Sequence, residues 1–482
     1  MEKRVLAELQ PERALYYFEE ICRIPHGSRN TKQISDYLVG FAKEHGLRAY
    51  QDEVNNVVIY KDASAGYEDH PTVILQGHMD MVAEKTKESP IDFLTDGLTI
   101  KTDGERIWAD GTTLGGDDGI AVAYALAILE ADDIPHPPLE CVFTVDEEIG
   151  MEGARALDPS VLKGRTLINC DSEAEGILTV SCAGGATSGL HLPISIDKAE
   201  GKGIHIYVDG LIGGHSGAEI HKGRANSNKL MGMLLGKLLR QMPYRLVYVR
   251  GGQKDNAIPR YTMAKVIVAE NRLDDALAAI DRIAKEVLAS VPPQETGAKI
   301  YTEACVCRGR AMNIASTKKV VGMLQDVPNG VQAMSRDIPG LVQTSLNLGI
   351  LKTENETVSM TFSVRSSVND EKLALIERLK AVGVLYGAAY TETGAYPAWE
   401  YKKESKLRDV MVSVFEKLYG RKPVVEAIHA GLECGLLSDK LPGLDCVSFG
   451  PDMKDIHTTR EELSIPSTFR TWKYLLAVLE RL

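Results

Sequence analysis

The stretch LECVFTVDEE, residues 139–148, decides the fold because it has the pattern of a buried β-strand that ends in carboxylates. Its first seven residues are rich in apolar and β-branched side chains, which favour strands. Asp146, Glu147 and Glu148 then follow in succession. Adjacent like charges repel one another unless opposite charge compensates them. Taken alone, such a cluster is typical of a solvated turn, so its meaning depends on the rest of the chain.

Two further stretches share this pattern. TVILQGH (72–78) and TLINCDSE (166–173) are also apolar runs followed by polar residues, and the apolar helical segment IAVAYALAILEA (120–131) lies between them. Continuous apolar strands that alternate with helices predict an α/β fold, with an open, mostly parallel sheet covered by helices on both faces. Ligands of such sheets bind beyond the carboxyl ends of the strands, which is where these polar residues fall.

The pattern of polar and apolar residues changes near residue 187 and changes back near residue 399. Residues 187–398 contain segments such as TSGLHLPISIDKAEGKGIHIYVDGL, in which polar and apolar residues alternate as in half-exposed antiparallel strands. The pattern of apolar strands and amphipathic helices returns in residues 399–482. We therefore expect one α/β domain, formed by residues 1–186 and 399–482, that is interrupted by an inserted α+β domain.

Composition excludes two classes of partner. The 482 residues include 55 Lys and Arg against 67 Asp and Glu, a formal net charge of −12, so no basic surface is predicted for nucleic acid or an anionic membrane. The longest apolar run, residues 120–129, is about half of the roughly 20 residues that span a bilayer. The N-terminal segment lacks the continuous apolar core of a signal peptide. We expect a cytoplasmic protein.

Five separate segments carry residues that bind metals or transfer protons. They are QGHMDMV with His78 and Asp80, LGGDDGIAVA with Asp117 and Asp118, VDEEIG with Glu147 and Glu148, NCDSE with Asp171, and GPDMKDIHTTREE with His457. Each has an ordinary explanation by itself, such as a helix cap or a turn. Together they would gather several carboxylates at one sheet edge, which divalent metals would compensate. Two imidazoles among carboxylates favour zinc, cobalt or manganese over calcium or magnesium.

In this order the segments resemble the dinuclear zinc amidohydrolases, a metallopeptidase family that includes glutamate-releasing carboxypeptidases and carnosinases. The resemblance is closest to the bacterial aminoacylhistidine (Xaa-His) dipeptidases and extends over essentially the whole chain. It rests on FEEICRIPHGSRN, DGTTLGGDDGIAVA, NCDSEAEGILTVSCAGG, GGHSGAEIHKGRANSNKL and HAGLECG. The resemblance implies a homodimer in which residues 187–398 form a lid and dimerisation domain. It also implies two divalent metal ions, zinc first, with cobalt or manganese as alternatives.

The family pattern assigns the metal ligands by position. It implies that His78 and Asp171 hold one metal, that Glu148 and His457 hold the other, and that Asp117 bridges them. A carboxylate can bridge two cations at the spacing of about 3.5–4 Å that is typical of paired-metal hydrolases. One departure is GGDDG, because relatives often carry Asn where this chain has Asp118. We expect the added negative charge to alter metal affinity.

The same resemblance assigns the catalytic residues. Asp80 would orient the imidazole of His78, and His215 in GGHSG would stabilise the oxyanion. Glu147 would take a proton from the metal-activated water and pass it to the leaving amine, since adjacent residues at a strand end point in different directions. Asp146 receives no role beyond a structural one.

Three further residues are weaker candidates for contact with the substrate. Asn256 and Arg260 lie in DNAIPR, and arginine suits a carboxylate by its bidentate geometry. His429 lies in the glycine-containing HAGLECG, where it could equally be a buried core histidine.

These observations predict a cytoplasmic metallopeptidase that cleaves unblocked dipeptides, with Xaa-His substrates such as β-alanyl-histidine implied by the resemblance. A di-zinc tripeptidase or an N-acyl amino acid deacylase could be built on the same site. From another class of protein, a non-catalytic metal- or peptide-binding module would be expected to have lost Glu147 or a ligand, and every such position is filled here.

Overall fold

The computed structural model describes residues 4–482, except for the side chains of residues 306–308. The chain forms two compact units. Unit 1 comprises residues 1–182, 401–427 and 432–482, and unit 2 comprises residues 183–400 and 428–431. Each unit has its own large apolar core.

Unit 1 is built on an eight-stranded sheet with the order β1-β2-β6-β3-β7-β21-β8-β20. The pairs β6–β3, β3–β7 and β7–β21 are parallel, whereas β1–β2, β2–β6 and β21–β8 are antiparallel. The predicted α/β fold is confirmed, with the parallel part of the sheet at its centre. The strands are β1 Arg48–Gln51, β2 Val57–Lys61, β3 Val73–His78, β6 Leu139–Thr144, β7 Thr166–Asn169, β8 Ile177–Cys182, β20 Val424–Ile428 and β21 Asp445–Ser448.

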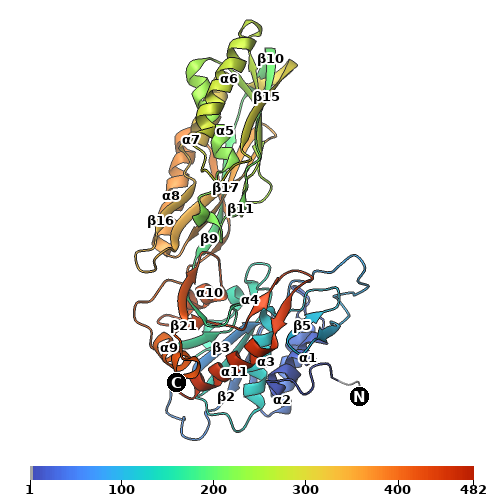
Figure 1. The fold of residues 1–482 in the computed structure, drawn as a ribbon. Helices are drawn as coiled ribbons and strands as arrows, with labels where there is room; N and C mark the ends of the chain where they lie inside the picture. Colours follow the sequence, from blue (N-terminus) through green and yellow to red (C-terminus); the bar gives the residue numbers. More distant parts are fainter. Residues whose placement is uncertain (1–3) are drawn as a thin grey trace. The chain divides into compact units, whose positions relative to one another are not determined.

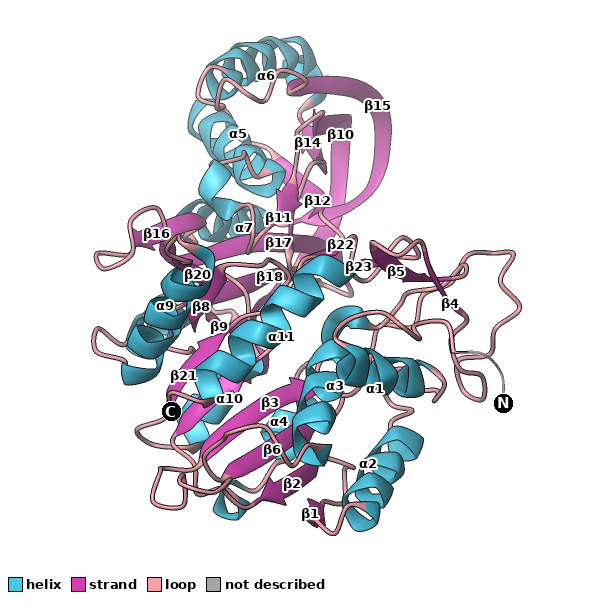
Figure 2. Cartoon of the chain, turned by 60° about the horizontal axis from the view of Figure 1, so that its bottom comes forward, coloured by secondary structure: helices cyan, strands magenta, loops and turns pink. Residues whose placement is uncertain are grey.

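Helices cover both faces of this sheet, as the continuous apolar strands predict. Helix α3 is buried on nearly all sides and packs between β3 and α1, and α9 and α11 pack together on the same core (Figure 2). Helices α4 and α10 pack against each other, and α10 also contacts β8 and β21. The helices are α1 Glu12–Cys22, α2 Lys32–Glu44, α3 Gly116–Glu130, α4 Glu152–Ala156, α9 Lys406–Tyr419, α10 Glu433–Lys440 and α11 Ile465–Leu479, with a 3-10 turn at Pro159–Val161.

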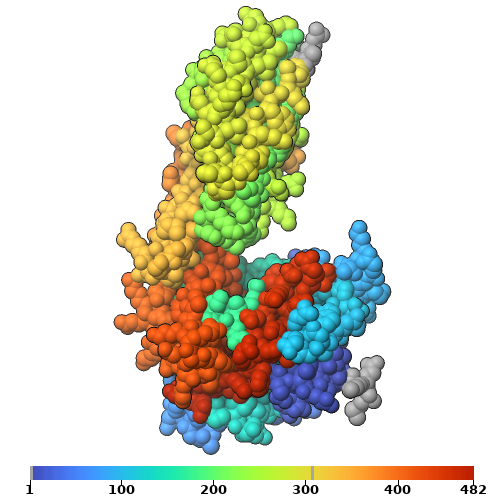
Figure 3. All heavy atoms as spheres, in the orientation of Figure 1, coloured from blue at the N-terminus to red at the C-terminus, as the bar shows by residue number. Residues whose placement is uncertain are grey.

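The C-terminal part of the chain completes unit 1 by joining a small sheet formed early in the sequence. The four strands have the order β22-β23-β5-β4, and Leu463 pairs with Ile107. The space-filling view shows the C-terminal segment in red beside the N-terminal segments in blue (Figure 3). These strands are β4 Ile100–Thr102, β5 Arg106–Ala109, β22 Met453–Lys454 and β23 Glu462–Ser464.

Unit 2 is an α+β structure with a largely antiparallel nine-stranded sheet, as the alternating sequence predicts. Its main path is β15-β10-β14-β12-β17-β18-β9-β19, with β16 paired to β17. Helices α5 to α8 pack on this sheet (Figure 1). The strands are β9 Gly184–Pro193, β10 Ile196–Asp209, β11 Gly214–His215, β12 Arg245–Gly251, β13 Ala257–Ile258, β14 Thr262–Val268, β15 Lys299–Met312, β16 Gly330–Met334, β17 Val342–Glu354, β18 Thr357–Ser366 and β19 Ala389–Tyr396. The helices are α5 Ser227–Gln241, α6 Leu273–Leu288, α7 Ile314–Asp326 and α8 Asn369–Tyr386, with 3-10 turns at Ile220–Lys222 and Glu270–Arg272.

None of the helices within the described part of the chain has both the length and the apolar character needed to cross a bilayer.

Candidate metal centre

The register of the central parallel strands gathers the predicted site residues at one edge of the unit 1 sheet. His78, the last residue of β3, pairs with Thr144, the last residue of β6. Gln76 of β3 pairs with Asn169, the last residue of β7. The polar residues that follow each strand therefore emerge side by side, at the carboxyl edge where α/β sheets bind ligands.

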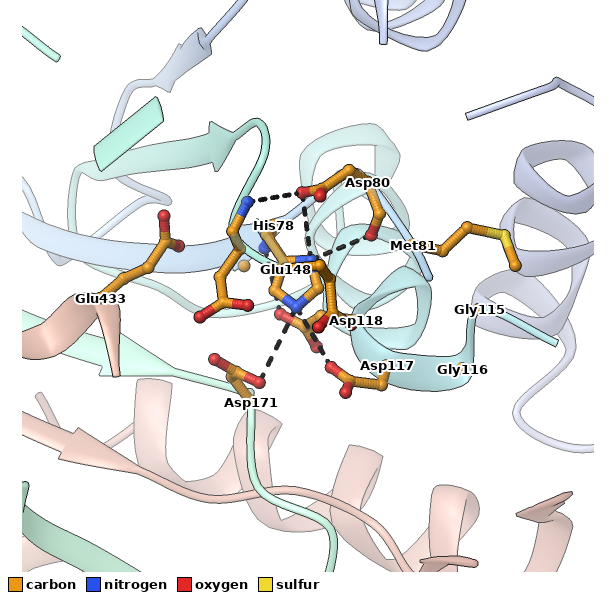
Figure 4. Close-up of polar contacts among 12 residues, drawn as sticks. His78, Asp80, Met81, Gly115, Gly116, Asp117, Asp118, Glu148, Asp171 and Glu433 are labelled. Carbon is orange, nitrogen blue, oxygen red and sulfur yellow. Dashed lines mark hydrogen bonds and ion pairs between the residues drawn. The ribbon is translucent and has the colours of Figure 1, made fainter. Parts of the chain in front are cut away.

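His78 lies at the centre of the resulting cluster (Figure 4). Its Nδ1 is 3.0 Å from the backbone oxygen of Asp80 and 3.5 Å from the Asp80 carboxylate. Its Nε2 lies 3.1 Å from Oδ1 of Asp117 and 3.9 Å from Oδ1 of Asp171. The acceptors at Nδ1 would keep the proton on that nitrogen when Nε2 gives up its own proton to bind a metal. The predicted orienting role of Asp80 is consistent with this geometry.

Asp117 lies between two imidazoles. Its Oδ1 is 3.1 Å from Nε2 of His78, and its Oδ2 is 3.0 Å from Nε2 of His457. Asp117 stands at the start of α3, just after Gly115, whose φ of 68° lies in the left-handed region. A side chain at Gly115 would also approach the Met81 sulfur to 2.9 Å, so glycine is needed at this turn. The arrangement can present one oxygen to each of two cations.

The three acidic residues that follow β6 make separate contacts. Asp146 takes a left-handed φ of 53°, and its Oδ1 accepts the backbone N–H of Arg29 at 2.5 Å. This contact fits the structural role expected of Asp146. The N–H of Glu147 donates to the Asp80 carboxylate at 3.0 Å. Oε1 of Glu148 lies 2.8 Å from Nε2 of His457. The turn thus gives the side chains of Asp146 and Glu148 different partners and holds Glu147 through its backbone.

Asp118 and Asp171 complete the buried part of the cluster. Asp118 is fully buried, and its Oδ2 accepts the backbone N–H of His78 at 3.2 Å. Oδ1 of Asp118 and Oδ2 of Asp171 are buried and have no hydrogen-bond partner among the described residues. Buried polar atoms normally have partners, so these oxygens indicate a ligand that would satisfy them.

Three groups of side chains have potential ligand atoms within 4.8 Å of one another. They are His78 with Asp118 and Asp171, His78 with Glu147 and Glu148, and Asp117 with Glu148 and His457. Two imidazoles, closely spaced carboxylates and unsatisfied oxygens fit divalent cations of the zinc, cobalt and manganese type. The site therefore has candidate ligands for a metal, and Asp118 belongs to one of the candidate groups.

The pKa values of the site residues show that the cluster lacks positive charge, which a cation would supply. Burial raises the pKa of Glu147 to about 8, although His78 opposes the effect. Burial, with repulsion from Asp118, raises the pKa of Asp171 well above its ordinary value. Hydrogen bonds to Asp117 and Glu148 raise the pKa of His457 to about 10. In the metal-free protein, bound protons compensate the negative charge of the cluster. A cation would displace these protons when it binds.

The remaining predicted residues belong to unit 2. Nδ1 of His215 lies 3.1 Å from the backbone nitrogen of Gly217 and accepts its N–H. A Cβ built at Gly217 would lie 2.7 Å from the His429 oxygen and 3.0 Å from the His215 ring, so the structure brings these two histidines together. The backbone oxygen of Asn256, rather than its side chain, accepts the backbone N–H of Ser216.

Arg260 and His429 also have structural partners within unit 2. Nε of Arg260 donates to the backbone oxygen of Leu211 at 3.0 Å, and this contact does not involve either histidine. His429 is buried, and its Nε2 lies 2.7 Å from Oγ of Ser345.

Sequence reasoning did not single out Arg365, which lies in β18 near both histidines. Burial lowers the pKa of both His215 and His429, and the charge of Arg365 is the next largest cause in each case. Nη1 of Arg365 contacts the Tyr396 hydroxyl at 3.2 Å, and its buried Nε has no hydrogen-bond partner among the described residues. The local signal for Arg365 is weak, since a single arginine in a strand is usually a surface residue.

Two buried glutamates, Glu433 and Glu461, received no assigned role from the sequence, although Glu433 lies in HAGLECG, a segment expected to return the chain towards the site. Glu433 is fully buried and accepts hydrogen bonds from Gln76 and Thr144, each at 2.6 Å. Burial raises its pKa to about 7. Glu461 is 3% exposed and accepts backbone N–H groups of residues 114–117. Both glutamates contact residues more than 250 positions away, which no local pattern reveals.

An α/β sheet with imidazoles and carboxylates gathered at its carboxyl edge is the architecture of a metal-dependent hydrolase. The chain belongs to peptidase family M20/M25/M40, which it matches over residues 74–481. The predicted metallopeptidase class is thereby confirmed.

Comparison with individual proteins confirms the resemblance to bacterial dipeptidases. The chain is 36% identical over 479 residues to the cytosol non-specific dipeptidase of Escherichia coli K12, covering 99% of both chains. It is also similar to the crystal structure of aminoacylhistidine dipeptidase from Vibrio alginolyticus, with a TM-score of 0.95, 36% identity and coverage of 100% and 98% of the two chains. The structure of aminopeptidase PepT from Bacillus cereus has a TM-score of 0.57 at 16% identity, with 98% of both chains covered, and shows the shared fold alone.

Proposed function

We propose that this protein is a cytoplasmic metallodipeptidase that hydrolyses the peptide bond of unblocked dipeptides. The observation that carries the proposal is the position of Asp117, whose two carboxylate oxygens contact two different imidazoles at 3.1 and 3.0 Å. The names of the Escherichia coli and Vibrio relatives, each aligned over nearly the whole chain, support dipeptides as the substrate class.

The proposed ligands form two sets that share one carboxylate. His78 and Asp171 would hold the first cation, Glu148 and His457 the second, and Asp117 both. The short contacts of Asp117 with both imidazoles support this assignment. We propose zinc as the metal, with cobalt and manganese as alternatives that the same donor set accommodates.

When bound, the metal ions would lower the pKa of water and polarise the substrate carbonyl. Glu147 would then take a proton from water as the general base and deliver it to the leaving amine as the general acid. Burial raises the pKa of Glu147 to about 8 in the metal-free protein, and the positive charge of two bound cations would lower it, so that the carboxylate could accept a proton near neutral pH. Asp80 would hold the His78 imidazole through the contacts of Nδ1.

Residues of unit 2 would recognise the substrate. We propose that His215 stabilises the oxyanion and that Arg365 receives the carboxylate of the dipeptide. An arginine with an unsatisfied buried nitrogen is suited to this task, because a guanidinium binds a carboxylate through paired charge-assisted hydrogen bonds. His429 lies near Arg365 and could contact the same carboxylate. Asn256 and Arg260 remain weaker candidates, since Arg260 already donates to Leu211.

We propose Xaa-His dipeptides, including β-alanyl-histidine, as favoured substrates, and residues 187–398 as a lid and dimerisation domain in a homodimer. The Vibrio relative is named for aminoacylhistidine substrates, whereas the Escherichia coli relative is named as non-specific. Breadth of specificity is therefore the property to measure. Light scattering after gel filtration would test the homodimer, because a monomer mass at micromolar protein would refute it.

The decisive experiment compares cleavage of β-alanyl-histidine, other dipeptides, a tripeptide and an N-acetyl amino acid by the purified protein. Each reaction is run as purified, after chelation, and after return of zinc. Chelator-sensitive, zinc-restored cleavage of dipeptides alone is the expected result. Cleavage of only the tripeptide or the acetylated compound would instead favour the alternative tripeptidase or deacylase. Absence of any cleavage despite bound metal would favour a binding module.

A further inference from the structure

Glu461 lies at the base of the hairpin that carries His457. Strands β22 and β23 form this hairpin, and residues 455–461 connect them. The backbone N–H of Glu461 donates to the Thr458 oxygen at 3.1 Å, which makes the loop compact. The side chain of Glu461 is 3% exposed and points away from solvent.

The Glu461 carboxylate accepts a run of backbone N–H groups from a different part of the chain. Its Oε2 accepts the N–H of Leu114 at 2.7 Å and the N–H of Gly115 at 3.1 Å. Its Oε1 accepts the N–H of Gly116 at 2.8 Å and the N–H of Asp117 at 3.4 Å. The carboxylate thus satisfies the N–H groups of the turn that begins α3, groups that no helix hydrogen bond could satisfy.

The glycines of this turn make the close approach possible. Gly115 has the left-handed φ of 68° that turns successive N–H groups towards one point. A Cβ built at Gly116 would lie 3.2 Å from Oε1 of Glu461 and 3.3 Å from the Met453 sulfur. The loop and the carboxylate are therefore in direct contact.

We infer that Glu461 is a positioning residue that locks the Asp117 loop to the His457 hairpin and so sets the spacing of the two residues. The inference rests on the proposed function, in which Asp117 and His457 hold the same cation. Their contact of 3.0 Å joins two segments 340 residues apart in sequence. Glu461 is a second buried ionisable side chain that connects those segments directly. Groups that orient ligands are commonly worth 10- to 100-fold in metal affinity or activity.

The test measures cobalt binding by the metal-depleted full-length protein. Titration calorimetry gives the affinity, and visible absorption reports the environment of the bound Co²⁺. Glu461→Gln keeps the shape of the side chain but replaces one acceptor oxygen with an NH₂ group, which would face two N–H donors. We expect Glu461→Gln to bind one of the two equivalents of Co²⁺ about 10- to 100-fold more weakly. We also expect a shifted absorption band, because the ligand geometry changes.

A matched control is Glu462→Gln on the same hairpin. Glu462 makes an ion pair of 2.8 Å with Arg106 and accepts none of the loop N–H groups, so its variant should match the wild type. A residue that only stabilised the fold would lower the unfolding temperature of the metal-free protein without changing Co²⁺ affinity or the spectrum. If Glu461→Gln fails to fold, Glu461→Asp decides by the same two readouts, because it keeps the charge and shortens the reach.

Wild-type affinity and a wild-type spectrum for the folded Glu461 variant would overturn the inference while leaving the proposed function intact. Failure of the wild-type protein itself to bind two equivalents of Co²⁺ would instead overturn the proposed function, and the inference with it.

Discussion

The Asp80 carboxylate accepts the backbone N–H of Glu147 at 3.0 Å. The same oxygen lies 3.5 Å from Nδ1 of His78, and the other oxygen accepts the hydroxyl of Ser28 at 2.8 Å. Asp80 therefore holds the turn that carries the proposed general base as well as the imidazole of the proposed ligand. These contacts keep the carboxylate ionised, because hydrogen bonds to the charged form lower its pKa even though burial opposes them.

Replacing Glu147 with glutamine should abolish most turnover and leave metal binding unchanged. The amide keeps the volume of the side chain but cannot carry a proton between water and the leaving amine. General acid–base catalysis contributes about 10²- to 10⁴-fold, so kcat should fall by at least about 100-fold. The matched control is Glu152→Gln, an exposed glutamate five residues away, which should retain full kcat. A Glu147→Gln enzyme with kcat within a few-fold of the wild type would remove Glu147 as the base.

Replacing His457 with alanine should reduce the metal content from two equivalents to one. His457 contacts both Asp117 and Glu148, so its loss leaves one cation without a nitrogen ligand. Metal analysis of the dialysed protein measures the stoichiometry. The exposed His45 offers a control, since His45→Ala should retain two equivalents. Two tightly bound equivalents in His457→Ala would contradict its assignment as a ligand.

Replacing Arg365 with alanine should raise KM for dipeptides by about 10- to 100-fold, with a smaller effect on kcat. A hydrogen bond to a charged group contributes about 1.5–3 kcal/mol, and each 1.4 kcal/mol is tenfold in affinity. Dipeptide amides, which lack the carboxylate, provide the matched substrate control. If Arg365 binds the carboxylate, the variant should handle the amides as the wild type does. An equal loss on acids and amides would indicate a role in folding or in another step.

The stability of unit 2 should depend on pH through His429. Burial, with the charge of Arg365 next in effect, lowers the pKa of this histidine to about 4 in the folded protein, whereas the unfolded value is about 6.5. Between these values the unfolded chain binds a proton that the folded chain does not. The stabilising contribution is therefore complete above about pH 6.5 and is lost as the pH falls towards 4.

His429→Gln removes this titration and keeps a hydrogen-bonding side chain beside Ser345. Between pH 7 and pH 4.5, the variant should lose roughly 2 kcal/mol less of its free energy of unfolding than the wild type. Urea unfolding at the two pH values, followed by a probe in unit 2, measures the difference. Equal losses in the two proteins would show that His429 does not remain neutral in the folded state.

Much of the fold could be predicted from local patterns of apolar and polar residues. Continuous apolar runs such as Val73–His78 identify buried strands, and the carboxyl ends of parallel strands must meet at one edge. His78 and the carboxylates after Leu139–Thr144 could therefore be expected to meet. The antiparallel strands that flank the parallel centre were harder to predict, since a short apolar run looks alike in either direction.

The parts of the site that could not be predicted depend on contacts between distant segments. Glu461 receives four N–H groups from residues that lie about 345 positions earlier. Its neighbours in sequence, Arg460 and Glu462, are ordinary surface charges, so nothing local distinguishes it. Arg365 likewise gains its significance only when β18 is placed near His215 and His429. Such contacts are set by the packing of whole elements rather than by periodicity.

Expression work often shortens a protein to the region that a family match spans, which here begins at residue 74. That cut would remove β1 and β2, which pair in succession onto β6, and would leave β6 as an unprotected edge prone to aggregation. It would also remove the Ser28 hydroxyl that supports Asp80. For anyone who manufactures or redesigns this enzyme, the first 73 residues are part of the catalyst rather than an optional extension.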